Sequence, residues 1–163
     1  MDTHHKTDMT RRGFLVQSGT ATAGAALVTL IPLSPASATS DEMAAAIKEV
    51  VGSAKLNPGK VTLDIPPLVE NGNAVPMKVS VESPMTARDH VKAIHVFNER
   101  NPQPYVMNAY LGPRAGRASV SAHIKLRESQ KLVAIAELSD GSFWTASANV
   151  IVTIAACVED LTL

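Results

Sequence analysis

The sequence predicts an all-β domain, an immunoglobulin-like antiparallel β-sandwich that follows a short N-terminal α-helix. From Lys60 onward, apolar residues alternate with polar ones at a period of two, which is typical of half-buried strands. About seven such segments follow one another, and turn signals separate them at regular intervals. Nothing in residues 60–154 resembles an interdomain linker or a repeat, so we expect one domain there. A β-barrel is the alternative fold.

Residues 1–38 are predicted to be a signal peptide rather than part of the fold. Arg11 and Arg12, followed by Phe14-Leu15, match the twin-arginine export pattern, and an apolar stretch rich in Ala, Gly and Thr comes next. Ala36 and Ala38 form a signal-peptidase site that predicts cleavage before residue 39. The alternative is a retained membrane anchor, but the apolar stretch is short and weakly apolar compared with the roughly 20 residues that a spanning helix needs. We therefore expect a periplasmic protein with no membrane segment in its mature form.

Residues 39–59 are predicted to form a helix and a connector. Thr39 and Glu42 have the spacing of a capping box, and the apolar residues that follow recur at helical intervals. Gly52 provides a signal for the end of the helix.

The domain at residues 60–154 contains the predicted strands. They cover residues 61–65, 75–81, 90–97, 105–111, 118–127, 131–138 and 143–154. The sequence leaves open whether the last strand is interrupted near Ser147-Ala148. Alternation is clearest in 118–127, where Ala118, Val120, Ala122, Ile124 and Leu126 share one face. Pro, Gly and Asn residues separate the strands, among them the turn signal Glu70-Asn71-Gly72-Asn73.

No catalytic or metal-binding constellation is recognisable in the sequence. It contains no phosphate-binding glycine loop, no HExxH and no cysteine pair. His90 and His95 lie five residues apart on one predicted strand and should point to opposite faces, while His123 lies on a polar face. We expect all three at the surface or facing a partner, and Trp144 sealing one end of the sandwich, with ligand stacking as its alternative role.

The charges of the chain suggest neither nucleic acid nor an anionic membrane surface as a partner, because 15 basic residues balance 15 acidic ones. Five basic residues nevertheless gather around one strand. They are either solvated or part of a docking surface, and comprise Arg114, Arg117, Lys125, Arg127 and Lys131.

Cys157 is the only cysteine and stands almost at the C-terminus, in Ala155-Ala156-Cys157-Val158-Glu159. In an exported protein an odd cysteine indicates an intermolecular bond or a free reactive thiol. The alternative is a small apolar residue at the end of a strand, since free cysteine is often buried.

Several motifs in this order resemble the SoxY family of sulfur-oxidation carrier proteins. They are Glu70-Asn71-Gly72 with Val75-Pro76, Asn101-Pro102-Gln103-Pro104, His123 to Gln130, and Leu138 to Trp144. The resemblance implies an immunoglobulin-like domain with an N-terminal helix, paired with a SoxZ-like subunit. It also implies that Cys157 holds sulfur intermediates of thiosulfate oxidation covalently on a C-terminal arm, which visits periplasmic sulfur-oxidising and redox enzymes. The chain would then be a carrier without cofactor or catalytic residue.

The arm departs from the Gly-Gly-Cys-Gly-Gly pattern of the family. In residues 155–163, Ala155, Ala156, Val158 and Glu159 replace the glycines. Alanine and β-branched valine are stiffer than glycine, and the carboxylates of Glu159 and Asp160 disfavour a thiolate beside them. An immunoglobulin-like assembly module that has lost carrier chemistry is therefore the alternative function.

Overall fold

The computed structural model describes residues 39–156. These residues lie within one unit of the chain, Ser34–Leu163. The predicted export signal with Arg11, Arg12, Ala36 and Ala38 lies outside the described residues, and so do Cys157, Val158 and Glu159.

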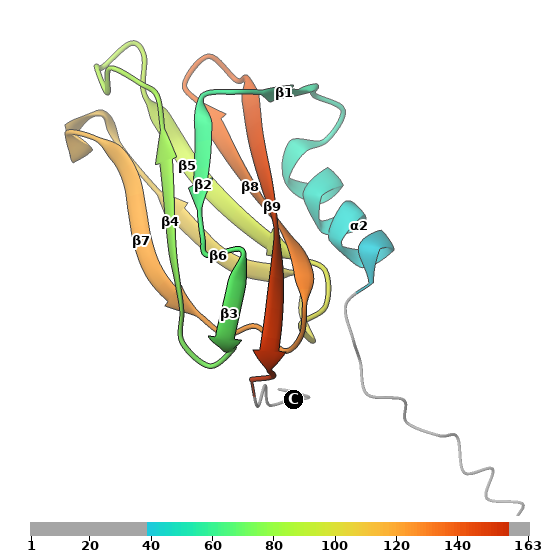
Figure 1. Ribbon diagram of the computed structural model, residues 1–163. Coiled ribbons are helices and arrows are strands. Elements are labelled where there is room, and N and C mark those ends of the chain that lie inside the picture. The colour runs from blue at the N-terminus through green and yellow to red at the C-terminus, as the bar shows by residue number, and fades with distance from the viewer. Residues whose placement is uncertain (1–38, 157–163) are drawn as a thin grey trace, which may run out of the picture. The chain divides into compact units, whose positions relative to one another are not determined.

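The described chain is a β-sandwich of a six-stranded and a three-stranded sheet, with one α-helix (Figure 1). The large sheet has the order β1-β9-β8-β5-β6, with β3 also paired to β9, and the small sheet has the order β2-β4-β7. The elements are α2 (Ser40–Val51), β1 (Leu56–Pro58), β2 (Val61–Asp64), β3 (Leu68–Asn71), β4 (Val75–Val81), β5 (Val91–Asn98), β6 (Tyr105–Tyr110), the 3₁₀ helix η1 (Pro113–Ala115), β7 (Ala118–Ile124), β8 (Gln130–Leu138) and β9 (Phe143–Ile154). The predicted all-β sandwich with an N-terminal helix is confirmed.

Two strands that the sequence did not predict, β1 and β3, pair in parallel with β9. They have three and four residues, and Pro58, Pro66 and Pro67 lie in or beside them, so neither shows a clear alternation. The sheet is therefore not purely antiparallel. The short strands β1 and β3 cover the edge of the long strand β9 near both of its ends and so protect an otherwise exposed edge. Strand β9 itself runs without a break, since Ser147 and Ala148 pair with Val133 and Leu132 of β8.

The main core lies between the two sheets. The side chains of β4 alternate between buried and exposed, as its sequence predicts, and Val75, Met77 and Val79 point inward. Opposite them, Ile94 of β5 and Leu132 of β8 are completely buried. Burial of such side chains contributes roughly 1.5–3 kcal/mol each.

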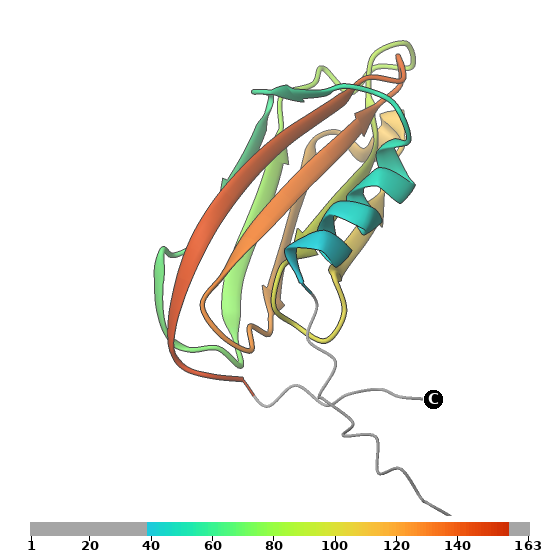
Figure 2. The same ribbon diagram turned by 90° about the vertical axis from the view of Figure 1, so that its right-hand side faces the viewer.

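Helix α2 covers the outer face of the large sheet, as the turned view in Figure 2 shows. Thr39 and Glu42 form the predicted capping box, and Gly52 ends the helix. A second core packs Met43 and other helix side chains against Phe97. Both faces of β5 and β8 are thus buried, because these two strands of the large sheet lie between the small sheet and α2.

A hydrogen bond also ties the helix to the edge strand β6. The hydroxyl of Tyr105 donates to the carboxylate of Glu49 over 2.6 Å. This hydrogen bond raises the pKa of Tyr105, because it stabilises the neutral phenol beside a negative charge.

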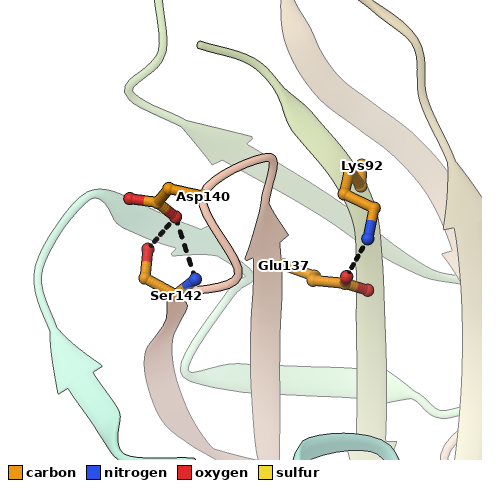
Figure 3. Close-up of polar contacts among 4 residues, drawn as sticks. All are labelled: Lys92, Glu137, Asp140 and Ser142. Atoms are coloured by element: carbon orange, nitrogen blue, oxygen red, sulfur yellow. Dashed lines mark hydrogen bonds and ion pairs between the residues drawn. The ribbon is translucent and has the colours of Figure 1, made fainter. Parts of the chain in front are cut away.

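The β8–β9 hairpin is held by polar contacts that Figure 3 shows. Asp140 accepts hydrogen bonds from the hydroxyl and the amide of Ser142 at 2.6 and 2.8 Å. These bonds, the one from the hydroxyl first, lower the pKa of Asp140 below its ordinary value of 3.8. Nearby, Lys92 of β5 forms an ion pair with Glu137 of β8.

Replacement of Phe97 by alanine should lower the free energy of unfolding by about 3–5 kcal/mol, because it leaves a cavity under α2. Urea denaturation measures this value. Tyr110→Ala is the matched control: it also removes an aromatic ring near His95, but 78% of Tyr110 is exposed, so the cost should stay at about 1 kcal/mol or less. Equal costs for the two variants would contradict the two-sided burial of β5.

The Asp140 turn predicts a pH-dependent difference between the wild type and Asp140→Asn. Because the folded-state pKa is lowered, the carboxylate stabilises the fold above the ordinary pKa, and this contribution is lost as the pH falls through the folded-state value. Asp140→Asn should lower Tm at neutral pH by no more than roughly 2 °C, as expected for an exposed position. In acid the two Tm values should coincide, and a difference that persists at every pH would refute this origin.

Candidate functional site

The candidate site is the point where the chain leaves the sandwich toward Cys157. The strand β9 ends at Ile154, and the last described residue is Ala156. The sequence assigns Ala155 and Ala156 to the arm. Ala155 is exposed, but Ala156 is 6% exposed and is therefore part of the packed domain.

A chain of backbone hydrogen bonds, which we call the root clasp, holds this exit. It consists of Gly72, Leu126, Ile154 and Ala156. The amide of Gly72 donates to the carbonyl of Ile154 over 2.9 Å, and the amide of Leu126 donates to the carbonyl of Gly72 over 2.8 Å. The amide of Ala156 then donates to the carbonyl of Leu126 over 3.1 Å. The residue before Cys157 is thereby bonded to a loop of the opposite side of the sandwich.

Glycine at position 72 is required by space. A Cβ atom there would lie 2.2 Å from the carbonyl oxygen of Leu126 and 3.0 Å from the amide nitrogen of Ala156. Both neighbours are backbone atoms, which cannot give way as a flexible side chain can. The sequence signal Asn71-Gly72 thus marks a close backbone approach between the sheets, where β3 of the large sheet leads to β4 of the small one.

The side chain of Asn101 braces the clasp from the β5–β6 loop. Its Nδ2 donates to the carbonyl of Lys125 over 2.8 Å, and its Oδ1 accepts from the amide of Arg127 over 3.0 Å. The residues on both sides of Leu126 are therefore fixed by one amide. Gln130, which is buried, donates its Nε2 to the same Oδ1 over 2.9 Å.

The last residues of β9 are also fixed beyond the end of the β8 pairing at Val150. The amide of Val152 donates to the hydroxyl of Ser129 over 2.9 Å. On the other edge, Thr153 donates its hydroxyl to the carbonyl of Glu70 over 3.1 Å. The strand that leads to the arm is thus held from two sides.

Sequence reasoning did not identify Gly72, Asn101 and Gln130 as residues of the site. They nevertheless stand in three of the motifs that resemble SoxY, and the structure brings these motifs together at the root clasp. The fourth motif, Leu138 to Trp144, lies at the β8–β9 hairpin instead. The signal that could have pointed to these residues was the family resemblance, which linked the distant motifs. Local sequence patterns could not, because the contacts join segments far apart in the sequence.

His95 and Trp144 are held by packing and hydrogen bonds within the domain, whereas His123 lies at the surface. The expectation that His95 lies at the surface is wrong: it is 6% exposed, and its Nδ1 forms a 2.7 Å hydrogen bond with Oδ1 of Asn108 across the β5–β6 pair. His123 is exposed, as expected. The indole of Trp144 packs against the main core and donates to the Ser142 hydroxyl over 3.0 Å, with the Lys60 ammonium above its ring.

The predicted basic cluster is not one surface. Arg114 and Arg117 precede β7, whereas Lys125 and Arg127 follow it, and a strand of seven residues spans roughly 20 Å. Only Lys125 and Arg127 flank the root clasp. Lys131 is exposed on β8.

Other features of the described residues carry no evident chemistry. Residues 39–156 contain no group of three or more side chains suited to hold a metal ion. No helix among these residues has the length and apolar character needed to cross a membrane. An open hollow of about 380 Å³ on the small sheet is lined by side chains that include Asp64, Lys78, Ser121 and His123.

Comparison with known proteins gives a consistent picture. Residues 47–157 match the family described as sulfur oxidation protein SoxY, so the match extends to Cys157 itself. The solved structure of the sulfur carrier protein SoxY from Chlorobium limicola f thiosulfatophilum aligns with a TM-score of 0.60 and 25% identity, over 71% of this chain and 100% of that one. A superoxide reductase (neelaredoxin) from Ignicoccus hospitalis aligns with a TM-score of 0.52 and 20% identity, over 58% of this chain and 80% of that one, which shows a shared fold alone. A search of curated proteins found no match.

The root clasp predicts a selective effect of Gly72→Ala. Because the added Cβ overlaps backbone atoms, we expect a loss of about 1–3 kcal/mol in the free energy of unfolding and faster hydrogen exchange at the Ala156 amide. Gly112→Ala is the matched control, since no atom lies within 4 Å of a Cβ at that position and its φ of −131° suits any residue. Unchanged exchange at Ala156 in Gly72→Ala would refute the clasp.

Proposed function

Since the chain belongs to the SoxY family of sulfur oxidation proteins, we propose that it is a carrier that holds a sulfur-containing intermediate covalently on Cys157. The observation that carries this proposal is the family match, which runs through residue 157 even though the neighbouring glycines are absent. The carrier has no catalytic residue and no cofactor of its own. Its cargo derives from an oxidisable sulfur compound such as thiosulfate.

The geometry of the exit suits a carrier. A transferable group must be presented to other proteins, and a thiol directly after a fixed residue has a defined starting point. Ala156 is fixed by the root clasp, so Cys157 begins within one peptide unit of a rigid frame. An enzyme that recognises the sandwich therefore also meets the point from which the chain continues to Cys157.

The chemistry of loading requires a redox partner. If thiosulfate is the cargo, a bond between Sγ of Cys157 and the terminal sulfur of thiosulfate releases the thiol proton and two electrons. We therefore propose that a periplasmic redox or sulfur-oxidising enzyme takes them up and joins the two sulfur atoms.

An apolar area beside the exit supports docking of such partners. Leu68 of β3 and Ile151 of β9 are register partners, and 58% and 57% of their surfaces are exposed. Ile154, at the end of β9, is also 64% exposed, but alternation along the strand places it on the face opposite to Ile151. Exposed apolar side chains that adjoin one another are typical of interaction sites. We propose a SoxZ-like subunit as the permanent partner, in a heterodimer that is exported folded to the periplasm under the signal in residues 1–38.

The covalent role of Cys157 is tested with protein purified from its native host after growth on a reduced sulfur compound. Intact-mass analysis should show a sulfur-containing adduct that maps to the Cys157 peptide and disappears on treatment with a thiol reductant. Cys157→Ser should carry no adduct and should abolish sulfur oxidation in a reconstituted system. Its Tm should remain that of the wild type, because residue 157 follows the last clasp residue.

Two results together would contradict the carrier function. They are unmodified Cys157 under every growth condition and full activity of Cys157→Ser. That combination would favour the assembly module, in which the sandwich organises partners and the thiol has no covalent role.

A further inference from the structure

The strand β7 forms a free edge of the small sheet. It pairs with β4 along its whole length, from Ala118 opposite Val81 to Ile124 opposite Val75, and no strand among residues 39–156 pairs with its other side. Every second residue of an edge strand directs its N–H and C=O groups away from its only neighbour. A row of such unpaired groups is a template for a further strand.

Strand β7 lacks the features that block the other edges of the described sheets. Strands β1, β2 and β3 have at most four residues each. Strand β6 follows Pro104, has a register shift opposite Phe97, and is bonded to α2 through Tyr105. Short length, proline and irregular register all protect an edge from added strands. In contrast, β7 has seven residues in continuous register, no proline, and His123 as its only titratable side chain.

The side chains of β7 define the kind of strand that fits beside it. On the outer face, the hydroxyl of Ser119 forms a 3.1 Å hydrogen bond with the hydroxyl of Ser80 on β4, and Ser121 is exposed. On the inner face, Val120 and Ala122 are only half-buried. Cross-strand pairs of hydroxyl side chains and of β-branched apolar ones stabilise a sheet. A strand in which such residues alternate would therefore extend both faces of the small sheet.

Exposed basic residues flank β7 at both ends. Arg114 and Arg117 precede it, and Lys125 follows it directly. No acidic group within residues 39–156 forms an ion pair with any of these three. Complementary charge gives an interface its register and its specificity. An extended segment with acidic residues at both of its ends therefore complements this edge.

The same charges disfavour a second copy of this chain as the occupant. Antiparallel pairing of two β7 strands about Ser121 would place Arg117 of one copy beside Lys125 of the other. Parallel pairing in register would place each cation beside its own equivalent. Like charges that lie directly opposite each other destabilise paired strands.

We propose that β7 accepts, by strand addition, an extended segment of a partner protein whose apolar and hydroxyl residues alternate between acidic ends. This inference goes beyond the proposed carrier function and does not depend on chemistry at Cys157. Strand β7 is the edge of the small sheet away from β2, whereas Leu68 and Ile151 lie on β3 and β9 of the large sheet (Figure 1). The two surfaces are separate, so both can be occupied at the same time.

A synthetic peptide tests the proposal on the full mature chain under reducing conditions. In this peptide Thr and Val alternate over the length of β7, and glutamates stand at both ends. Its titration into ¹⁵N-labelled protein should shift the backbone resonances of residues 118–124 and slow hydrogen exchange at alternate amides among them. The affinity should fall as salt is added. A peptide with lysines at its ends should bind more weakly, and one with alternate N-methylated residues should not bind.

Charge reversal makes the test specific. Arg117→Glu/Lys125→Glu should weaken binding of the acidic peptide by about tenfold and reverse the preference between the two peptides, since two exposed charge pairs become repulsive. Lys48→Glu is the matched control: it makes the same change at an exposed position of α2, on the opposite side of the sandwich, and should leave the affinity unchanged. All three positions are exposed, so the variants should keep the wild-type Tm.

The proposal is overturned if the acidic peptide leaves residues 118–124 unshifted, or if the peptides with acidic and basic ends bind equally well. Binding that tolerates N-methylation would equally exclude strand addition. Sedimentation of the protein without peptide covers the remaining occupant. A dimer whose formation protects the β7 amides would assign this edge to a second copy and overturn the partner proposed here.

Discussion

The close approach of Gly72 to the carbonyl of Leu126 is the constraint on which the functional end of this protein depends. It allows the turn between β3 and β4 to pass from the large sheet to the small one within hydrogen-bond distance of the β7–β8 connection. The carbonyl of Leu126 then accepts the amide of Ala156. Because residue 72 has no side chain, backbone hydrogen bonds can join both sheets and the strand that leads to Cys157 at this point. A larger residue at position 72 could not be accommodated by a change of rotamer.

The remainder of the fold makes this end rigid. Strands β5 and β8 are buried on both faces, between the small sheet and α2, and such a closely packed middle layer deforms little. The polar residues Asn98 and Gln130 are buried near its end, and each has a hydrogen-bond partner. A frame of this kind fixes the point at which the chain leaves the sandwich after β9.

The sequence allowed the main elements to be predicted wherever a local pattern sets them. The period-two alternation predicted β4 and β7, and the spacing of Thr39 and Glu42 predicted the start of α2. The pattern could not give β1 and β3, because these strands are short, adjoin prolines and form only through pairing with the distant strand β9. His95 was misplaced for a similar reason, since its partner Asn108 becomes adjacent only when β5 and β6 pair.

The candidate site was predictable in part. Cys157 stood out as the only thiol of a chain that the sequence predicts to be exported, and the resemblance to the SoxY family suggested a role for it. The residues that fix its position were hidden, because Asn71-Gly72 is as typical of an ordinary turn as of a close approach between backbones. Similarly, Asn101 shows no sign in the sequence that its amide bonds to residues 125 and 127.

The central claim is that the rigid frame extends through Ala156, immediately before the thiol. Backbone ¹⁵N relaxation along residues 150–163 tests it most directly. The account predicts an order parameter for the Ala156 amide near 0.85, the value of a rigid backbone, equal to that of the middle of β9. A value below about 0.6 at Ala156, with the decline beginning before Ile154, would contradict it.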